Sequence, residues 1–351
     1  MNKSRALEVI ALVLLVGTSR LAAQREAVQA PSGWGGLALV PTAVGYNLEG
    51  HERSLAELEV PTGTRLTAID ELDGGWIAAG DRLVADGGEL VLLLSAGGGS
   101  HQIDEPSGRF GFRQRATLLV SHGRLEGLAW LEGDGGEKNS VVVARRVGDL
   151  WAPSETVSPL SDQAQLALSG TVLGDGSFLL VWAAVDGDDE EIMWSRYGDS
   201  AWSEPARIHP DNSVPDIVPA VAAVHGGALV AWSQFDGKDY RLKIARFDGE
   251  NWHDTEFSGE EGSLYPTVFG VGARVGFLYS TVSPRTWSLV QVNPSGRVVR
   301  RSGIARQVEP RPLVFEASED RVIIRFAGED TGHVTSGSSA MEMSLEWVSE
   351  P

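Results

Sequence analysis

The chain has 351 residues, with 48 acidic and 29 basic side chains, a formal net charge of −19 and no cysteine. The lack of cysteine excludes disulfides, thiolate metal sites and cysteine nucleophiles. The negative charge argues against nucleic acid and anionic membrane surfaces as partners, because both are bound mainly through Lys and Arg.

The N-terminal segment is predicted to be a signal peptide. Lys3 and Arg5 give it a charged start, an apolar run follows over residues 6–17, and a small-residue exit ends at Ala23. This order of charged, apolar and small residues is typical of secretory signals. We expect cleavage after Ala23.

The domain assignment follows from that cleavage. Residues 1–23 are the signal peptide, and residues 24–351 are expected to form a single domain of a secreted or periplasmic protein with no membrane insertion. Cleavage after Ala30 and an uncleaved N-terminal anchor are the alternatives. The anchor is disfavoured because the apolar run is short for a membrane span.

A repeat of about 50 residues runs through the middle of the chain. Three apolar runs end in tryptophans that lie 52 and then 50 positions apart, namely Trp130, Trp182 and Trp232. Each is followed after 20 or 21 positions by a second tryptophan, at Trp151, Trp202 and Trp252. Each unit holds four short β-prone runs separated by Gly and Asp turns. This period and strand number are typical of a β-propeller blade.

More diverged units flank these copies, over residues 65–95, 267–304 and 313–348. We therefore predict an all-β fold, a β-propeller of about six four-stranded antiparallel blades, with seven blades as the alternative. The segment Leu37–Val60 has no complete unit and is expected to add one or two strands to the C-terminal blade. Such closure removes exposed sheet edges. The recurring tryptophans are expected to fill the space between blades rather than to stack on sugars.

An eight-residue pattern recurs between the third and fourth strands. It reads Ala144-Arg-Arg-Val-Gly-Asp-Leu-Trp151, Ser195-Arg-Tyr-Gly-Asp-Ser-Ala-Trp202 and Ala245-Arg-Phe-Asp-Gly-Glu-Asn-Trp252. These segments resemble degenerate Asp boxes, the S-x-D-x-G-x-T-W hairpins of the sialidase/BNR-repeat propellers, and residues 95–102 are a weaker copy. The tryptophan and the small first residue fit, and Gly148 and Gly249 match the box glycine, but the box aspartate is missing throughout.

The resemblance covers most of residues 61–305 and implies a shape rather than an activity, because the boxes of that family lie on the face away from the active site. Sialidases use three arginines, a Tyr with a Glu partner, and an aspartic acid. The early Arg-bearing strand of the family has no counterpart here, and Arg65, Arg285 and Arg311 are scattered. We therefore assign no catalytic residue.

One face of the propeller is expected to carry the function. The loops that join strands two and three, and those that join one blade to the next, gather there around the axis and are rich in carboxylates. Acids and tyrosines that converge on this face would hydrogen-bond a sugar or hold Ca²⁺, the one cofactor we consider. The candidate ligand-binding residues are Asp186, Asp188, Asp189, Asp216, Asp236, Asp239, Tyr240 and Tyr265. The alternative is that these are solvated turn residues, since Asp-Gly turns alone produce such acids.

The sequence thus predicts an exported, monomeric, non-catalytic binding or scaffold protein with a glycan or protein ligand. The first alternative is a glycoside hydrolase, sialidase-like or other, that uses carboxylates in an axial pocket, because the spacing of such a pair is set only in three dimensions. The second is a protein-interaction propeller. The histidines show no zinc-binding spacing, so no metal ligand is assigned.

Overall fold

The computed structural model describes the strands at 38–41, 46–49 and 54–58 and then residues 61–73, 75–85, 87–96, 99–108, 111–135, 138–159, 164–187, 189–210, 212–255, 257, 259–271, 274–282, 285–293, 296–305, 312–317, 321–326 and 341–348. The predicted signal peptide and Asp188 lie outside these ranges. Within them, no helix is long and apolar enough to cross a membrane.

The described strands form seven antiparallel units in chain order. The first three units are β1 (Ala38–Pro41), β2 (Tyr46–Glu49) and β3 (Ser54–Leu58); β4 (Thr64–Leu72), β5 (Gly75–Val84), β6 (Gly87–Ala96) and β7 (Gly99–Gln102); and β8 (Phe112–Ser121), β9 (Arg124–Gly133), β10 (Asn139–Val147), β11 (Leu150–Trp151) and β12 (Glu155–Ser158). The fourth is β13 (Gln165–Val172), β14 (Phe178–Asp186), β15 (Asp189–Gly198), β16 (Ala201–Trp202) and β17 (Ala206–Arg207). The last three are β18 (Asp216–Val224), β19 (Gly227–Phe235), β20 (Tyr240–Phe247) and β21 (Trp252–Asp254); β22 (Ser263–Val271), β23 (Arg274–Val282), β24 (Arg285–Val292) and β25 (Val298–Ala305); and β26 (Pro312–Ala317), β27 (Arg321–Phe326) and β28 (Met341–Glu346).

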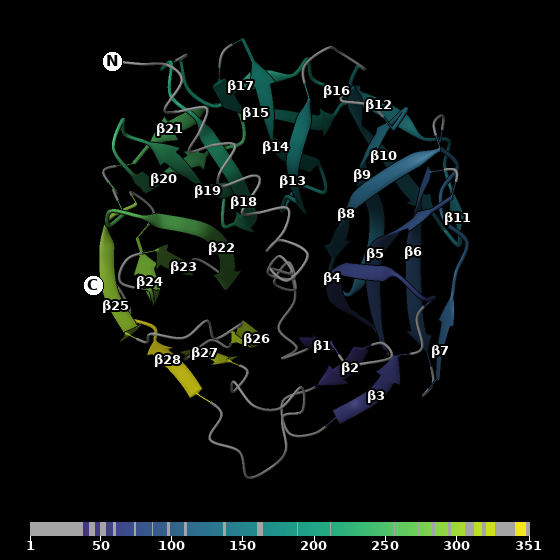
Figure 1. Ribbon diagram of the computed structural model, residues 1–351, viewed down its shortest axis with the longest axis horizontal. Helices are drawn as coiled ribbons and strands as arrows, with labels where there is room; N and C mark the ends of the chain where they lie inside the picture. The colour runs from purple at the N-terminus through teal and green to yellow at the C-terminus, as the bar shows by residue number, and fades with distance from the viewer. Residues whose placement is uncertain are drawn as a thin grey trace.

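The units are arranged like the blades of a propeller, with the first strand of each nearest the middle (Figure 1). First strands of successive units pack on one another, as β8 does on β13, β13 on β18, and β18 on β22. A single parallel bridge between Gly88 and Phe112 joins the second unit to the third. The predicted all-β propeller architecture is confirmed.

The structure differs from the expectation that Leu37–Val60 adds strands to the C-terminal blade. Among the described strands, β1, β2 and β3 pair with one another and not with β26–β28. β1 lies beside β26 on one side and β4 on the other. This segment therefore makes a seventh unit of its own, the blade number that we held as the alternative, instead of lending strands to the last blade.

The second-strand aromatics form the core between blades, as predicted. Trp130 and Trp182 are fully buried and Trp232 is nearly so. Trp182 packs with Leu131 and Val143 of the preceding unit in one apolar cluster. Burying aromatic surface between neighbouring sheets is what a unit of this kind needs, because it cannot cover both of its faces alone.

Four of the first strands share an irregularity near their start. In each of β8, β13, β18 and β22, two residues near the start of the strand lie opposite one residue of the second strand, which shifts the register by one. The first of these two residues is in turn Arg115, Leu166, Val218 and Tyr265. A bulge bends a strand and re-aims a side chain, and Arg115, Val218 and Tyr265 have left-handed backbones at this point.

Candidate functional site between two blades

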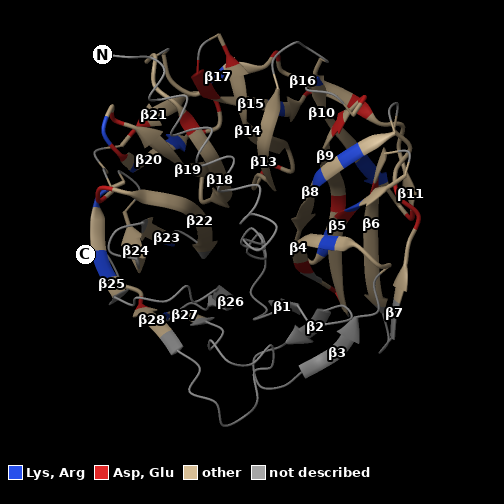
Figure 2. Cartoon of the chain, in the orientation of Figure 1, with Lys and Arg blue, Asp and Glu red and all other residues tan. Residues whose placement is uncertain are grey.

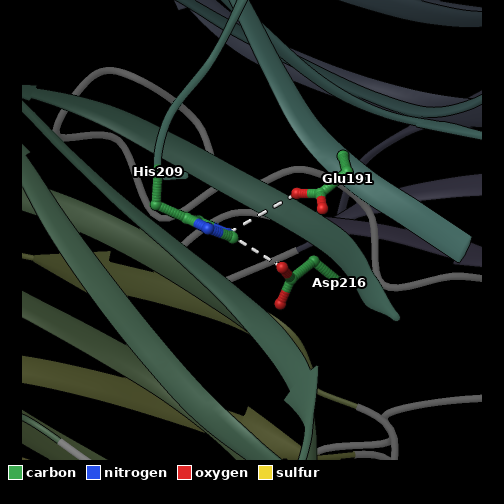
Figure 3. Close-up of side chains that lie close together, drawn as sticks. All are labelled: Glu191, His209 and Asp216. Atoms are coloured by element: carbon green, nitrogen blue, oxygen red, sulfur yellow. Dashed lines mark ion pairs between the residues drawn. The ribbon is translucent and has the colours of Figure 1, made fainter. Parts of the chain in front are cut away.

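Three titratable side chains meet at the junction of the fourth and fifth units. Glu191 lies on β15, His209 on the connection that leaves β17, and Asp216 at the start of β18. One potential ligand atom from each lies within 4.8 Å of the other two. Figure 3 shows the imidazole of His209 between the two carboxylates. The site therefore depends on two blades packing together.

Asp216 is the best-anchored member of this cluster. Its side chain has no exposed surface, and its Oδ1 accepts a hydrogen bond from Trp232 Nε1 at 2.9 Å. Its Oδ2 accepts one from Asn212 Nδ2, also at 2.9 Å. His209 Nε2 lies 2.8 Å from the same Oδ2. This contact is an ion pair. It does not have the geometry of a hydrogen bond, and His209 Nε2 has no hydrogen-bond partner among the described residues.

His209 is held by contacts on its other sides. Its Nδ1 lies 2.8 Å from the carbonyl oxygen of Pro210, to which an Nδ1–H can donate. Its ring stacks on Trp232, with centroids 5.5 Å apart and planes 12° from parallel. These contacts direct Nε2 toward the acids.

Glu191 stands out because its carboxylate is buried without hydrogen-bond partners. Its side chain has no exposed surface, and Oε2 lies 3.9 Å from His209 Nε2. Neither carboxylate oxygen has a hydrogen-bond partner among the described residues. A buried ionised carboxylate in this state is costly, so the site favours a proton or a cation at Glu191.

The pKa shifts reflect this arrangement. Burial raises the pKa of Glu191 to about 7, an effect that Asp216 increases and that His209 and Arg207 oppose. Burial on its own lowers the pKa of His209, but the contact with Asp216, the Pro210 carbonyl and Glu191 together raise it to about 9. The metal-free cluster therefore holds protons at neutral pH.

A half-buried rim of tyrosines and acids adjoins the cluster. Burial, and then the charges of Glu190, Tyr265 and Asp216, raise the pKa of Tyr240 to about 12, so these groups lie close together. The Tyr240 ring packs on Phe235, with centroids 5.4 Å apart. Tyr265 is 37% exposed and occupies the bulge of β22 with φ +55°. A bulky residue in this conformation is strained.

Of the eight predicted ligand residues, the structure brings Asp216, Tyr240 and Tyr265 together. Asp189 is half-buried at the adjoining end of β15. Asp186 lies in the same hairpin and forms an ion pair with Arg207 at 2.6 Å. Asp188 lies outside the described residues.

Asp236 and Asp239 have a turn-forming environment instead. Asp236 Oδ1 accepts hydrogen bonds from the backbone N–H groups of Lys238 and Asp239. Its Oδ2 pairs with Arg241 at 2.7 Å, and Arg241 lowers the pKa of Asp236 to about 2. Asp239 Oδ1 accepts from the backbone N–H of Tyr240. For these two residues the structure agrees with the alternative reading as turn residues.

Sequence reasoning missed Glu191 and His209 as site residues. Both lie at the ends of loops that we placed on the functional face. The prediction instead favoured acids that were expected to be exposed in those loops. Carboxylates are in fact spread over many of the described strands and loops (Figure 2). What distinguishes this junction is the burial of its acids. A histidine seven positions before Asp216, in the connection between two blades, is the one sequence signal that pointed there.

Comparisons with known proteins identify the fold. No family model matches the sequence, and no curated protein matches it. A solved structure of a polysaccharide lyase, an ulvan lyase bound to a -[GlcA(1-4)Rha3S]- chain, is 10% identical, with a TM-score of 0.54 over 87% of this chain and 94% of that chain. This level of identity supports a shared fold alone.

Two further structures have lower TM-scores than the lyase. A puromycin-hydrolysing peptidase from Mycobacterium tuberculosis is 16% identical with a TM-score of 0.49 and covers 87% of this chain. A Trypanosoma rangeli sialidase is 11% identical, with a TM-score of 0.44 over 66% of this chain. The chain spans about half the length of both, 52% of the peptidase and 45% of the sialidase. The sialidase/BNR resemblance stays a prediction from the sequence.

Proposed function

We propose that the protein is an exported, non-catalytic β-propeller that binds a glycan on the rim formed by Glu190, Tyr240 and Tyr265. The observation that carries this proposal is Tyr265, a residue that is 37% exposed on a strained bulge with φ +55°. Strained conformations tend to persist where the exposed side chain serves a purpose.

The chemistry of the rim suits a sugar. Tyrosine offers an apolar ring face for the C–H surface of a pyranose and a hydroxyl for hydrogen bonding. Burial raises the pKa of Glu190, an effect to which Asp189 and Asp216 add, and its carboxyl oxygens can accept hydrogen bonds from sugar hydroxyls. Small-molecule sites usually combine an apolar surface with a small number of polar groups.

Charge narrows the class of glycan. The acids beside Glu190 are Asp189 and Asp216, whose charges both act on it. Uronate or sulfate groups would be repelled, whereas neutral sugars and amino sugars would not. We therefore expect a preference opposite to that of the ulvan lyase, whose structure contains a sulfated, uronate-bearing chain.

The hydrolase alternative requires two carboxylates that reach the substrate. Glu191 and Asp216 are close together, but the side chains of both have no exposed surface. A buried pair cannot contact a glycosidic bond from this conformation. This burial supports binding without turnover.

A glycan array tests the proposal. The exported protein is applied to immobilised neutral, amino-sugar, uronate and sulfated glycans, and the supernatants of soluble substrates are analysed for cleavage products. We expect retention on neutral or amino-sugar glycans with no product. Retention on none, or a preference for sulfated chains, contradicts the proposal, and product formation would establish the hydrolase alternative.

Export and a monomeric state are parts of the same proposal. The predicted cleavage after Ala23 gives a mature chain that begins at Gln24. N-terminal sequencing of the protein recovered from medium or periplasm checks the first point, since an intact Met1 would contradict it. Light scattering of the same sample checks the second.

A further inference from the structure

We propose that Glu191, His209 and Asp216 bind a divalent transition-metal ion, with Zn²⁺ as the probe, and that this ion clamps the β13–β17 blade to the β18–β21 blade. The inference stands apart from the glycan proposal. It rests on side chains beneath the rim rather than on the exposed tyrosines.

The geometry offers one nitrogen and two oxygen ligands from three separate segments. Their ligand atoms lie within 4.8 Å of one another, and both carboxylates face the imidazole (Figure 3). Zinc binds His nitrogen and carboxylate oxygen at about 2.0–2.2 Å. Small side-chain rotations bring the three atoms to that distance around one ion.

The surroundings of these ligands are those of a supported metal site. Metal-binding histidines usually donate the second ring N–H to a carbonyl or carboxylate. His209 Nδ1 lies 2.8 Å from the Pro210 carbonyl oxygen. Asp216 is likewise held by Trp232 and Asn212. Nε2 of His209 and the carboxylates are left to face one another.

Glu191 supplies an independent observation. Its side chain is fully buried, and neither oxygen has a hydrogen-bond partner in the part of the chain that the structure describes. The carboxylate points toward His209 (Figure 3). Native structures rarely leave such a group unsatisfied, and a bound ion is one of the standard ways to satisfy it.

The ligand types favour a transition metal over Ca²⁺. An imidazole suits Zn²⁺ and its neighbours in the first transition row, whereas Ca²⁺ prefers six to eight oxygen ligands. Two carboxylates and a neutral imidazole would balance the charge of one Zn²⁺ ion.

Burial suggests a structural role for the ion. The side chain of His209 is 10% exposed, and those of Glu191 and Asp216 are not exposed at all. Because the ligands come from both blades, a bound ion would oppose their separation. An ion that binds only the folded state raises the melting temperature by mass action.

The test uses the full exported chain after removal of metal with EDTA and dialysis. Calorimetric titration with ZnCl₂, metal analysis and thermal melting are expected to show one Zn²⁺ per chain and a Tm increase of roughly 5 °C at saturating Zn²⁺. Parallel samples receive CaCl₂ or MgCl₂. A Tm increase with Ca²⁺ and none with Zn²⁺ overturns the proposal, as does a wild-type protein that retains no Zn²⁺.

Variants separate a metal site from a fold effect. His209→Gln is expected to weaken Zn²⁺ binding at least about tenfold. Glu191→Gln removes a buried charge that has no hydrogen-bond partner, so it should raise the Tm of the metal-free protein while abolishing the increase caused by Zn²⁺. This combination cannot arise from simple destabilisation, and it keeps the test valid if His209→Gln fails to fold.

The matched control is His253→Gln. His253 Nε2 lies 2.6 Å from Asp248 Oδ2 in an exposed pair, with side chains 57% and 38% exposed. This variant should keep the full response to Zn²⁺. A response that survives Glu191→Gln and His209→Gln, or that is lost in His253→Gln, overturns the assignment.

Discussion

The imidazole of His209 stacks on the indole of Trp232, with ring centroids 5.5 Å apart and planes 12° from parallel. Trp232 is also one of the tryptophans that mark the blade repeat, and its Nε1 donates to Asp216 Oδ1 at 2.9 Å. One residue thus serves both the packing between blades and the placement of the cluster. The equivalent Trp182 has no hydrogen-bond partner for its Nε1 among the described residues.

This difference predicts unequal effects of the same substitution. Trp232→Phe leaves Asp216 without a donor in a buried site, whereas Trp182→Phe removes an indole N–H that is unsatisfied already. We expect Trp232→Phe to lower the free energy of unfolding by about 1–3 kcal/mol more than Trp182→Phe. Guanidinium denaturation of both variants measures the difference, and equal losses would argue against the hydrogen bond.

Asp216 is expected to be the acid on which the junction depends most. Asp216→Asn removes the buried partner of His209 and should lower the free energy of unfolding of the metal-free protein by about 3–5 kcal/mol. Asp236→Asn is the control, because Asp236 is a partly exposed turn residue whose Oδ1 acceptor would be kept. Urea denaturation should show a much smaller change for this control. Similar losses in the two variants would refute a special role for Asp216.

The pKa of Glu191 predicts that Glu191→Gln gains stability relative to wild type as the pH rises, when EDTA keeps both proteins free of metal. Its folded pKa of about 7 lies above the ordinary value of 4.5, so the folded state binds the extra proton between these values and wild-type stability falls as pH rises through this window. The variant lacks this group. Its stability relative to wild type should therefore increase by roughly 2–3 kcal/mol from pH 4.5 to pH 7.

His209 extends the same trend to higher pH. Its pKa is raised from 6.5 to about 9, so the stabilisation it provides is complete below pH 6.5 and is lost as pH rises through 9. The groups that face the pair are Asp216, Asp189 and Arg207, together with the Pro210 carbonyl. Denaturation curves at pH 5, 7 and 9 test both windows, and a flat difference between Glu191→Gln and wild type would contradict the assigned shift.

Much of the fold could be predicted because the sequence itself is periodic. Trp130, Trp182 and Trp232 recur in register, and the structure places each in the core between blades. The seventh unit was harder to predict. The strands β1–β3 lack the tryptophan markers, so only pairing in three dimensions showed that they form a sheet of their own.

The site could be predicted only in part, for physical reasons. Loop position placed Asp216, Tyr240 and Tyr265 on one face, but an Asp that caps its own turn, such as Asp236, looks the same in sequence as one that faces a ligand. Glu191 and His209 are 18 positions apart and meet only because a strand and a connection fold against the next blade. Burial of a carboxylate is a property of that packing and not of the local sequence.

The most direct test of the binding account compares Tyr265→Ala with Leu166→Ala. The two residues occupy the same bulge position in different blades and are 37% and 38% exposed. With the glycan selected on the array, calorimetry should show affinity at least tenfold weaker for Tyr265→Ala, since loss of an aromatic contact costs on the order of 1–2 kcal/mol. Leu166→Ala should bind like wild type. Unchanged affinity in Tyr265→Ala, or an equal loss in both variants, would contradict the account.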